Sequence, residues 1–204
     1  LLMHTMEIKE HVDLAPYTTL KVGGPARYFV TVHTIDELAQ VRQFAQQAGV
    51  PVLVLGQGSN VLVSKQGYAG VVIINQILGR EYKKELGEST LASFGSGENW
   101  DEIVADTVAR SLWGLENLSH IPGTVGATPV QNVGAYGVEV SDRITTVDAF
   151  SLLSGESKTF TNAECEFTYR DSFFKTDAGR DWIITSVTFS LSENNADAVV
   201  GYVD

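Results

Sequence analysis

The chain of 204 residues contains a single cysteine, Cys165, so no intramolecular disulfide and no cysteine-based metal site can form. Histidine is also scarce, and its four positions lack the spacing of metal ligands: His4, His11, His33 and His120. These shortages argue against a metal enzyme.

Basic residues are few, since Lys and Arg total 14 against 25 Asp and Glu, which gives a formal net charge of −11. A nucleic acid or an anionic membrane surface as partner would require clustered Lys and Arg. The sequence therefore predicts no nucleic-acid partner. Any phosphate ligand must be bound locally, against the overall negative charge.

Long apolar runs are absent, because none approaches the roughly 20 residues that a membrane-spanning helix needs. The N-terminal segment carries Glu7 and Glu10 and lacks a basic stretch followed by an apolar one. We therefore expect no membrane insertion and a cytoplasmic protein. A hydrophobic content of 44% is ordinary for one large or two small globular domains.

What the chain does have is a glycine-rich stretch, 121–137, that has neither a helical nor a strand pattern. Between Leu112 and Val138 lie five glycines and two prolines, with Glu116 as the one formal charge. Glycine allows positive φ and close backbone approach, and amides left unpaired by such turns form concave donor surfaces. We interpret the stretch as a ligand cradle; the alternative is a packed turn without a ligand.

A second glycine loop, Gly56–Asn60, follows an apolar strand at 52–55 and precedes a second short apolar run at 61–63. A strand-loop-strand order does not suit a Rossmann turn, which needs a helix after its glycines, and a Walker loop needs Gly-Lys-Ser/Thr. The pattern instead predicts a tight loop that hydrogen-bonds a pyrophosphate, with Gly58 letting the backbone come close. Taken alone, it would be an ordinary hairpin.

Helices and strands alternate without a simple repeat, which predicts an α+β class. The Thr34–Glu37 capping box opens a helix that Gly49 and Pro51 stop, and Asn99 with Glu102 opens a second. The other predicted elements are strands at 52–55, 61–63, 70–75, 90–94, 144–153, 157–160 and 182–191 and a short helix at 161–165. The charged segment 79–85 marks a soft domain boundary.

Five segments in order resemble one family, the UDP-N-acetylenolpyruvoylglucosamine reductases, which are flavoenzymes of peptidoglycan synthesis. These segments are Thr19–Ala26, Gly56–Leu62, Gly95–Trp100, Gly114–Gly137 and Tyr169–Lys175. The resemblance covers most of the chain.

The resemblance implies a two-subdomain FAD-binding fold of the vanillyl-alcohol-oxidase/p-cresol-methylhydroxylase type, with non-covalent FAD between the subdomains. It places the pyrophosphate on the first loop, at Gly56, Gly58, Ser59 and Asn60. It places the isoalloxazine and ribityl chain along the cradle, at Ile121, Pro122, Gly123, Gly126, Thr128, Gln131, Asn132, Gly134, Tyr136 and Gly137.

The same resemblance implies NADPH as hydride donor and the enolpyruvyl ether of a UDP-sugar as substrate. Arg170 corresponds to the arginine that steadies the enol intermediate, a role suited to a permanently charged guanidinium. From the residues alone, a surface ion pair of Arg170 with Asp171 or Glu166 is the favoured reading. Tyr202 resembles a tyrosine that closes over the substrate.

Chains of this family continue into a third domain that binds most of the UDP-sugar and supplies the proton donor. We therefore interpret the chain as a fragment that lacks this C-terminal substrate domain and expect it to be inactive alone. The expected divisions are 1–78 and 79–191 as the two FAD-binding subdomains and 192–204 as the start of the truncated region.

Three alternatives remain open at this point. The first is the FAD-binding portion of another oxidase of the same fold, many of which tether flavin through His or Cys. The second is a non-catalytic flavin-binding module. The third is an α+β domain whose glycines only form turns.

Overall fold

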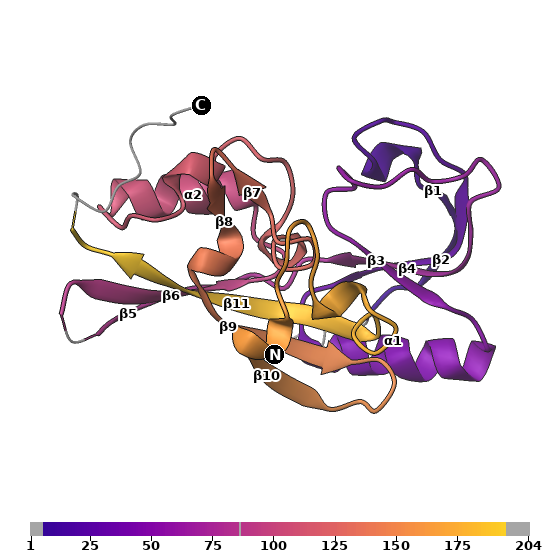
Figure 1. Ribbon diagram of the computed structural model, residues 1–204. Coiled ribbons are helices and arrows are strands. Elements are labelled where there is room, and N and C mark those ends of the chain that lie inside the picture. Colours follow the sequence, from indigo (N-terminus) through magenta and orange to yellow (C-terminus); the bar gives the residue numbers. More distant parts are fainter. Residues whose placement is uncertain (1–5, 86, 195–204) are drawn as a thin grey trace. The chain divides into compact units, whose positions relative to one another are not determined.

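The computed structural model describes residues 6–85 and 87–194 (Figure 1). The chain divides into two compact units, the first ending at Ile77 and the second beginning at Leu78. Each unit has its own sheet and its own hydrophobic core. The mixture of sheets with few helices confirms the α+β class predicted from the sequence.

The first unit is built on a four-stranded sheet of mixed direction. Its elements are β1 Lys9–Asp13, the 3-10 helix η1 Ala15–Tyr17, β2 Pro25–Val32, α1 Ile35–Ala48, β3 Val52–Leu55 and β4 Tyr68–Asn75. The strand order is β1-β2-β4-β3; β1 is antiparallel to β2, whereas β2 and β3 run parallel to β4. Helix α1 provides the connection from β2 to β3 (Figure 1).

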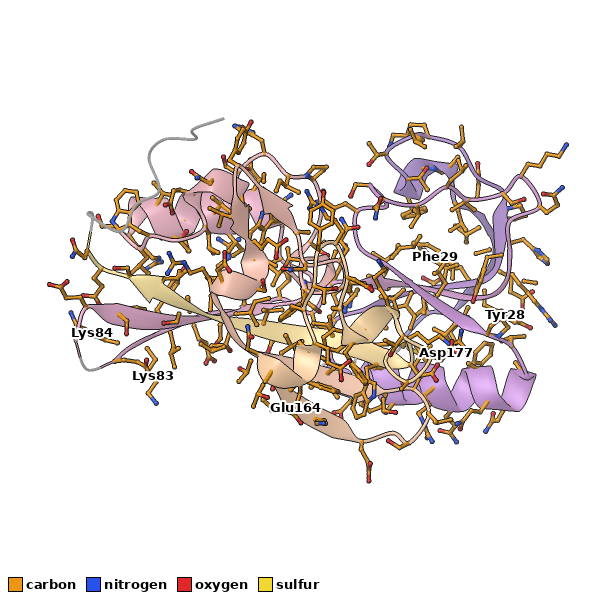
Figure 2. The ribbon with its side chains drawn as sticks, in the orientation of Figure 1. Tyr28, Phe29, Lys83, Lys84, Glu164 and Asp177 are labelled. Atoms are coloured by element: carbon orange, nitrogen blue, oxygen red, sulfur yellow. The ribbon has the colours of Figure 1, made fainter. Side chains whose placement is uncertain are left out.

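Strand β2 shows why this sheet is covered on both faces. The Tyr28 ring packs edge-on against Phe44 of α1 at a centroid distance of 4.9 Å. The next residue, Phe29, faces the other way and lies 4.6 Å from the Tyr17 ring of η1 (both strand residues are labelled in Figure 2). Because successive side chains of a strand alternate, one aromatic pair anchors the helix and the other anchors the N-terminal segment.

The second unit contains a five-stranded sheet in which all neighbours are antiparallel. Its strand order is β10-β9-β11-β6-β5, and a separate two-stranded ribbon joins β7 to β8. The strands and the helix are β5 Arg80–Lys84, β6 Ser89–Gly95, α2 Trp100–Ala109, β7 Gly134–Ala135, β8 Val138–Glu139, β9 Ile144–Ser151, β10 Ser157–Thr161 and β11 Trp182–Ser192. The 3-10 helices are η2 Glu116–Leu118, η3 Val125–Ala127, η4 Val140–Asp142, η5 Ala163–Cys165 and η6 Phe173–Lys175.

Trp100, the first residue of α2, anchors this helix in the core of the second unit. Its fully buried ring lies 5.9 Å from that of Phe189 on β11, and its indole N–H donates to the Leu118 carbonyl at 2.8 Å. A buried tryptophan needs such a partner for its one polar atom. The N-terminus of α2 is thereby fixed to both the sheet and the loop that follows the helix.

Both predicted helix starts are confirmed. The Thr34 hydroxyl accepts from Glu37 N at 3.2 Å, and the Asn99 side chain accepts from Glu102 N at 3.1 Å. Gly49 ends α1 in the left-handed conformation, as predicted. The predicted short helix at 161–165 is present as the 3-10 helix η5.

The predicted strand at 61–63 is wrong, because the structure has no regular element there. Val61 and Val63 pack against the core of the first unit, while Leu62 between them is exposed. The short apolar run resembled a buried strand, but the segment has no strand partner. The element after the Gly56–Asn60 loop is still a strand, β4, and not a helix.

The charged segment 79–85 contains strand β5, which the sequence pattern missed. Its side chains are held by one acid before α2 and one acid on it: Arg80 pairs with Glu98 at 2.7 Å, and the Tyr82 hydroxyl donates to Asp106 of α2 at 2.5 Å. Burial, followed by this hydrogen bond, raises the pKa of Tyr82 to about 12. The same bond lowers the pKa of Asp106.

The Tyr82 phenol should therefore make stability depend on alkaline pH. An acid whose pKa is raised by folding stabilises the fold below its unfolded pKa, about 10 for tyrosine, and loses that contribution as the pH rises through about 12. We expect urea unfolding to show a loss of stability over this pH range that Tyr82→Phe removes. Tyr169→Phe, which removes an exposed phenol, is the control, and the same loss in Tyr82→Phe as in the original protein would contradict the prediction.

Candidate functional site

The Gly56–Asn60 loop lies directly after β3, as predicted, and the structure shows a reason for glycine at position 58 besides the approach of a ligand. Gly58 has φ +63°, and an added Cβ would collide with the Tyr17 carbonyl oxygen and lie 2.9 Å from Thr18 Cα. The Gly58 carbonyl also accepts from Thr19 N at 3.1 Å. Glycine is therefore required here by packing within the first unit, whether or not a ligand approaches.

The other residues of this loop lie nearer the surface. Gly56 and Ser59 are half-buried, Asn60 is exposed, and Leu62 just beyond the loop is 78% exposed. Large exposed apolar side chains beside a polar loop are typical of a surface that a ligand or another segment covers.

In the second unit, the first part of the cradle is paired to the segment that precedes α2. Three backbone hydrogen bonds join them: Val125 N to Glu98 O at 2.9 Å, Gly126 N to Ser96 O at 2.9 Å, and Trp100 N to Gly123 O at 3.1 Å. These bonds hold the first part of the cradle against the start of α2, although the cradle has no long strand of its own. At Gly126 an added Cβ would lie 2.7 Å from the Ser96 Cβ, so only glycine allows this approach.

Ser96 is a candidate site residue that the sequence analysis did not identify. It is 1% exposed, and its hydroxyl has no hydrogen-bond partner in the part of the chain that the structure describes. A buried hydroxyl without a partner, in contact with a glycine-rich loop, fits a site that receives a polar ligand. In the sequence, the signal that could have identified Ser96 is its place between two glycines shortly before the helix N-cap Asn99.

The second part of the cradle ends in a tight hairpin turn between β7 and β8. Tyr136 and Gly137 form its corner with φ of +51° and +74°, the combination that a type I′ turn requires. Tyr136 is 65% exposed. The glycine at 137 is thus explained by the turn, and the tyrosine is left on the surface.

Arg170 lies at the tip of another tight turn, in which Thr168 and Asp171 exchange two backbone hydrogen bonds of 3.1 Å. Its own φ is +56°, and its guanidinium donates to the Gly134 carbonyl at 2.6 Å. The ion pair with Asp171 or Glu166 that the bare sequence favoured is not formed within the described chain; Asp171 pairs instead with Lys175 at 3.2 Å. The structure thus brings Arg170 onto the end of the cradle.

The Asn132 side chain, which belongs to the cradle along which the resemblance places the isoalloxazine and ribityl chain, is hydrogen-bonded within the second unit. It is 1% exposed, and its amide nitrogen donates to the Glu139 carboxylate at 2.7 Å and to the Thr168 carbonyl at 3.0 Å. Its amide oxygen accepts from Ser141 N at 3.1 Å. Both amide hydrogens are therefore committed within the protein.

The remaining predicted residues span a range of exposure. Gly123, Thr128 and Gly134 are buried, Ile121 and Gln131 are half-buried, and Pro122 is exposed. The predicted Tyr202 lies outside the described residues.

The chain matches the FAD binding domain family over residues 26–160. It belongs to that family. Its fold also resembles a vanillyl-alcohol-oxidase-type flavoprotein from Myceliophthora thermophila, with a TM-score of 0.62 at 15% identity over 82% of this chain and 32% of the other. The predicted fold type is thereby confirmed, and FAD is the cofactor of this fold.

Two similar proteins are UDP-N-acetylenolpyruvoylglucosamine reductases, as the five segments predicted. The reductase of Pseudomonas putida is 44% identical to this chain. The match covers 92% of this chain and 55% of the Pseudomonas reductase. The crystal structure of the Thermus caldophilus reductase has a TM-score of 0.74 and 31% identity over 93% of this chain and 64% of that one. The chain thus spans about half the length of the Pseudomonas relative. In the described residues, no helix is both long and apolar enough to cross a membrane.

The role found for Gly58 leads to a prediction about stability. Gly49 has the same φ of +63° with nothing within 4 Å of an added Cβ, so Gly49→Ala introduces only the backbone strain. Gly58→Ala adds the collision with Tyr17, and we expect it to destabilise the first unit by about 1–3 kcal/mol more. Denaturant unfolding followed by hydrogen exchange within β2 and β4 measures this. Equal losses of stability in the two variants would mean that the Gly58 loop moves away from Tyr17 without an energetic cost.

Proposed function

We propose that the chain is the flavin-binding part of an NADPH-dependent oxidoreductase that converts UDP-N-acetylglucosamine enolpyruvate to UDP-N-acetylmuramate. The observation that carries this proposal is the 44% identity to the Pseudomonas reductase over 92% of the chain. The reaction would take place in the cytoplasm during peptidoglycan synthesis, and so support cell shape and division. Because this chain matches 55% of the Pseudomonas reductase, we expect the 204 residues alone to be inactive.

FAD, when bound, supplies the hydride carrier between NADPH and the enolpyruvyl group. We assign its pyrophosphate to Gly56, Gly58, Ser59 and Asn60, whose loop contains no Lys or Arg and so must act through amides and side-chain dipoles. We assign its ring and ribityl chain to the cradle 121–137, to which Ser96 adds a buried hydroxyl. Asn132 would contribute its backbone alone, because its side chain is bonded to Glu139 and Thr168. The exposed Tyr136 side chain offers a ring for such a ligand to cover.

Arg170 would stabilise negative charge that develops on the enolpyruvyl group. A guanidinium remains charged at every working pH and presents a planar fork of N–H donors that matches a carboxylate or enolate. The hydrogen bond to Gly134 fixes the guanidinium at the end of the cradle and leaves it near the exposed Tyr169, whose ring centroid lies 5.7 Å away. Donors fixed before the reaction are the most effective, since they need no reorganisation when charge forms.

The second candidate is the alternative left open by the sequence, an oxidase of the same fold that tethers its flavin through His or Cys. Cys165 does not suit that role: it is fully buried in the core of the second unit, and burial raises the pKa of its thiol to about 12. His120 remains a candidate tether, since its side chain is exposed beside Asp101 at 3.7 Å.

Non-covalent binding is therefore the first functional prediction. After reconstitution with FAD, acid precipitation should release all of the flavin into the supernatant, as measured by its visible absorption. His120→Ala should give the same result as the original protein. Yellow colour in the washed pellet that disappears in His120→Ala would establish the tethered alternative.

The role of Arg170 is tested in the full-length protein that contains this chain. Arg170→Ala should slow oxidation of the reduced flavin by the enolpyruvyl substrate about 100- to 1000-fold, because one donor to developing charge is lost. Reduction of the flavin by NADPH should stay nearly unchanged. Stopped-flow absorbance measures the two half-reactions separately.

Arg170→Lys is the matched variant, since it keeps the charge but loses the planar fork, and it should recover only part of the rate. Equal damage to both half-reactions would assign Arg170 a structural or flavin-holding role. No damage to either would leave it as a surface residue.

A further inference from the structure

Arg170 is held by a closed ring of contacts that runs through Asn132 and Glu139. The Asn132 amide donates to the Thr168 carbonyl, and the Thr168–Asp171 turn leads to Arg170. Arg170 then donates to the Gly134 carbonyl. Gly134 is the ladder partner of Glu139, and the Glu139 carboxylate accepts from the Asn132 amide, which closes the ring.

The ring joins two segments that are far apart in the sequence, the end of the cradle and the Arg170 turn. A further hydrogen bond joins the same two segments: the Ser172 hydroxyl donates to the Val130 carbonyl at 2.7 Å. Arg170 itself is an exposed residue in the left-handed region, a strained conformation that a non-glycine residue keeps only where its surroundings hold it. Its guanidinium would otherwise be a mobile surface group.

We propose that Asn132, oriented by Glu139, is a positioning residue that fixes the Arg170 turn against the cradle. This rests on the function proposed for Arg170. Asparagine suits the task because one amide nitrogen donates two hydrogens in different directions, here to a carboxylate and to a main-chain carbonyl. It also tolerates the positive φ of +44° at position 132. Its side chain acts on the substrate through Arg170 and not by contact.

The test compares Asn132→Asp with Asn162→Asp. Aspartate keeps the size and the tolerance of positive φ at position 132 but replaces two N–H donors with acceptors facing Glu139 and Thr168. Asn162 is a matched control, because its amide also donates two bonds of 2.9 Å, to the carbonyls of Ser141 and Ile144, and it lies outside the ring. Both variants change the net charge equally.

The first readout needs no activity and uses the 204-residue chain. Trypsin cleaves after Arg170, and its rate at this bond follows the fraction of time that the turn is open. Mass spectrometry should show roughly tenfold faster cleavage after Arg170 in Asn132→Asp, the effect expected when hydrogen bonds to a charged group and a carbonyl are lost. Asn162→Asp should cleave there at close to the original rate.

The second readout uses the full-length protein loaded with FAD. Asn132→Asp should slow the substrate half-reaction about tenfold or more, while its FAD affinity and its reduction by NADPH stay unchanged. In an Arg170→Ala background the same substitution should cause no further loss, because a residue that acts only through Arg170 has nothing left to position.

The outcomes separate this proposal from the function on which it rests. If Arg170→Ala leaves the substrate half-reaction intact, the function proposed for Arg170 fails. Whether Asn132 holds the turn is then decided by the rate of tryptic cleavage after Arg170 in Asn132→Asp. If Arg170→Ala slows the reaction but Asn132→Asp changes neither that rate nor the cleavage, the positioning role is overturned. A loss of FAD affinity in Asn132→Asp alone would overturn it in favour of a direct cofactor contact.

Discussion

The backbone pairing of residues 96–100 with residues 123–126 is the constraint on which the second unit's candidate site depends. A long segment with only one 3-10 turn and one two-residue strand must find other partners for its buried amides and carbonyls. The cradle finds them on the turn before α2, whose position Trp100 fixes through its bond to the Leu118 carbonyl. The glycine at 126 follows from this pairing, because a side chain there would meet Ser96.

The pairing also links the charged strand β5 to the site. Glu98, whose carbonyl accepts from Val125, has its carboxylate held by Arg80 and by the Gly79 amide. A mostly buried carboxylate keeps its charge only with such partners. Glu98, whose backbone is paired to the cradle, thus has its charge matched by a cation of the same unit. The cradle therefore remains a charge-poor surface in a chain with a net charge of −11.

Local signals predicted the elements that local physics determines. Thr34 and Asn99 were identifiable as helix caps because a cap bonds amides two or three residues away. Strands β9 and β11 were identifiable because apolar residues at every second position indicate a strand with one buried face. Strand β5 was missed because its alternate side chains are paired charges rather than apolar residues. The segment 61–63 was mistaken for a strand because its three residues are all apolar, whereas strand pairing depends on a partner distant in the sequence.

The site residues show where sequence reasoning reaches its limit. Composition located both glycine loops, but it did not distinguish a glycine that faces a ligand from one that makes room for Tyr17, as Gly58 does. The same holds for polar residues: Asn132 lies in the middle of the cradle, yet its backbone conformation turns the amide inward to Glu139 and Thr168. Conversely, Ser96 lies outside the cradle in sequence and reaches it through backbone pairing. A polar side chain in a glycine-rich loop is therefore a ligand contact only if the protein has not already satisfied its hydrogen bonds, and that is decided by residues remote in the sequence.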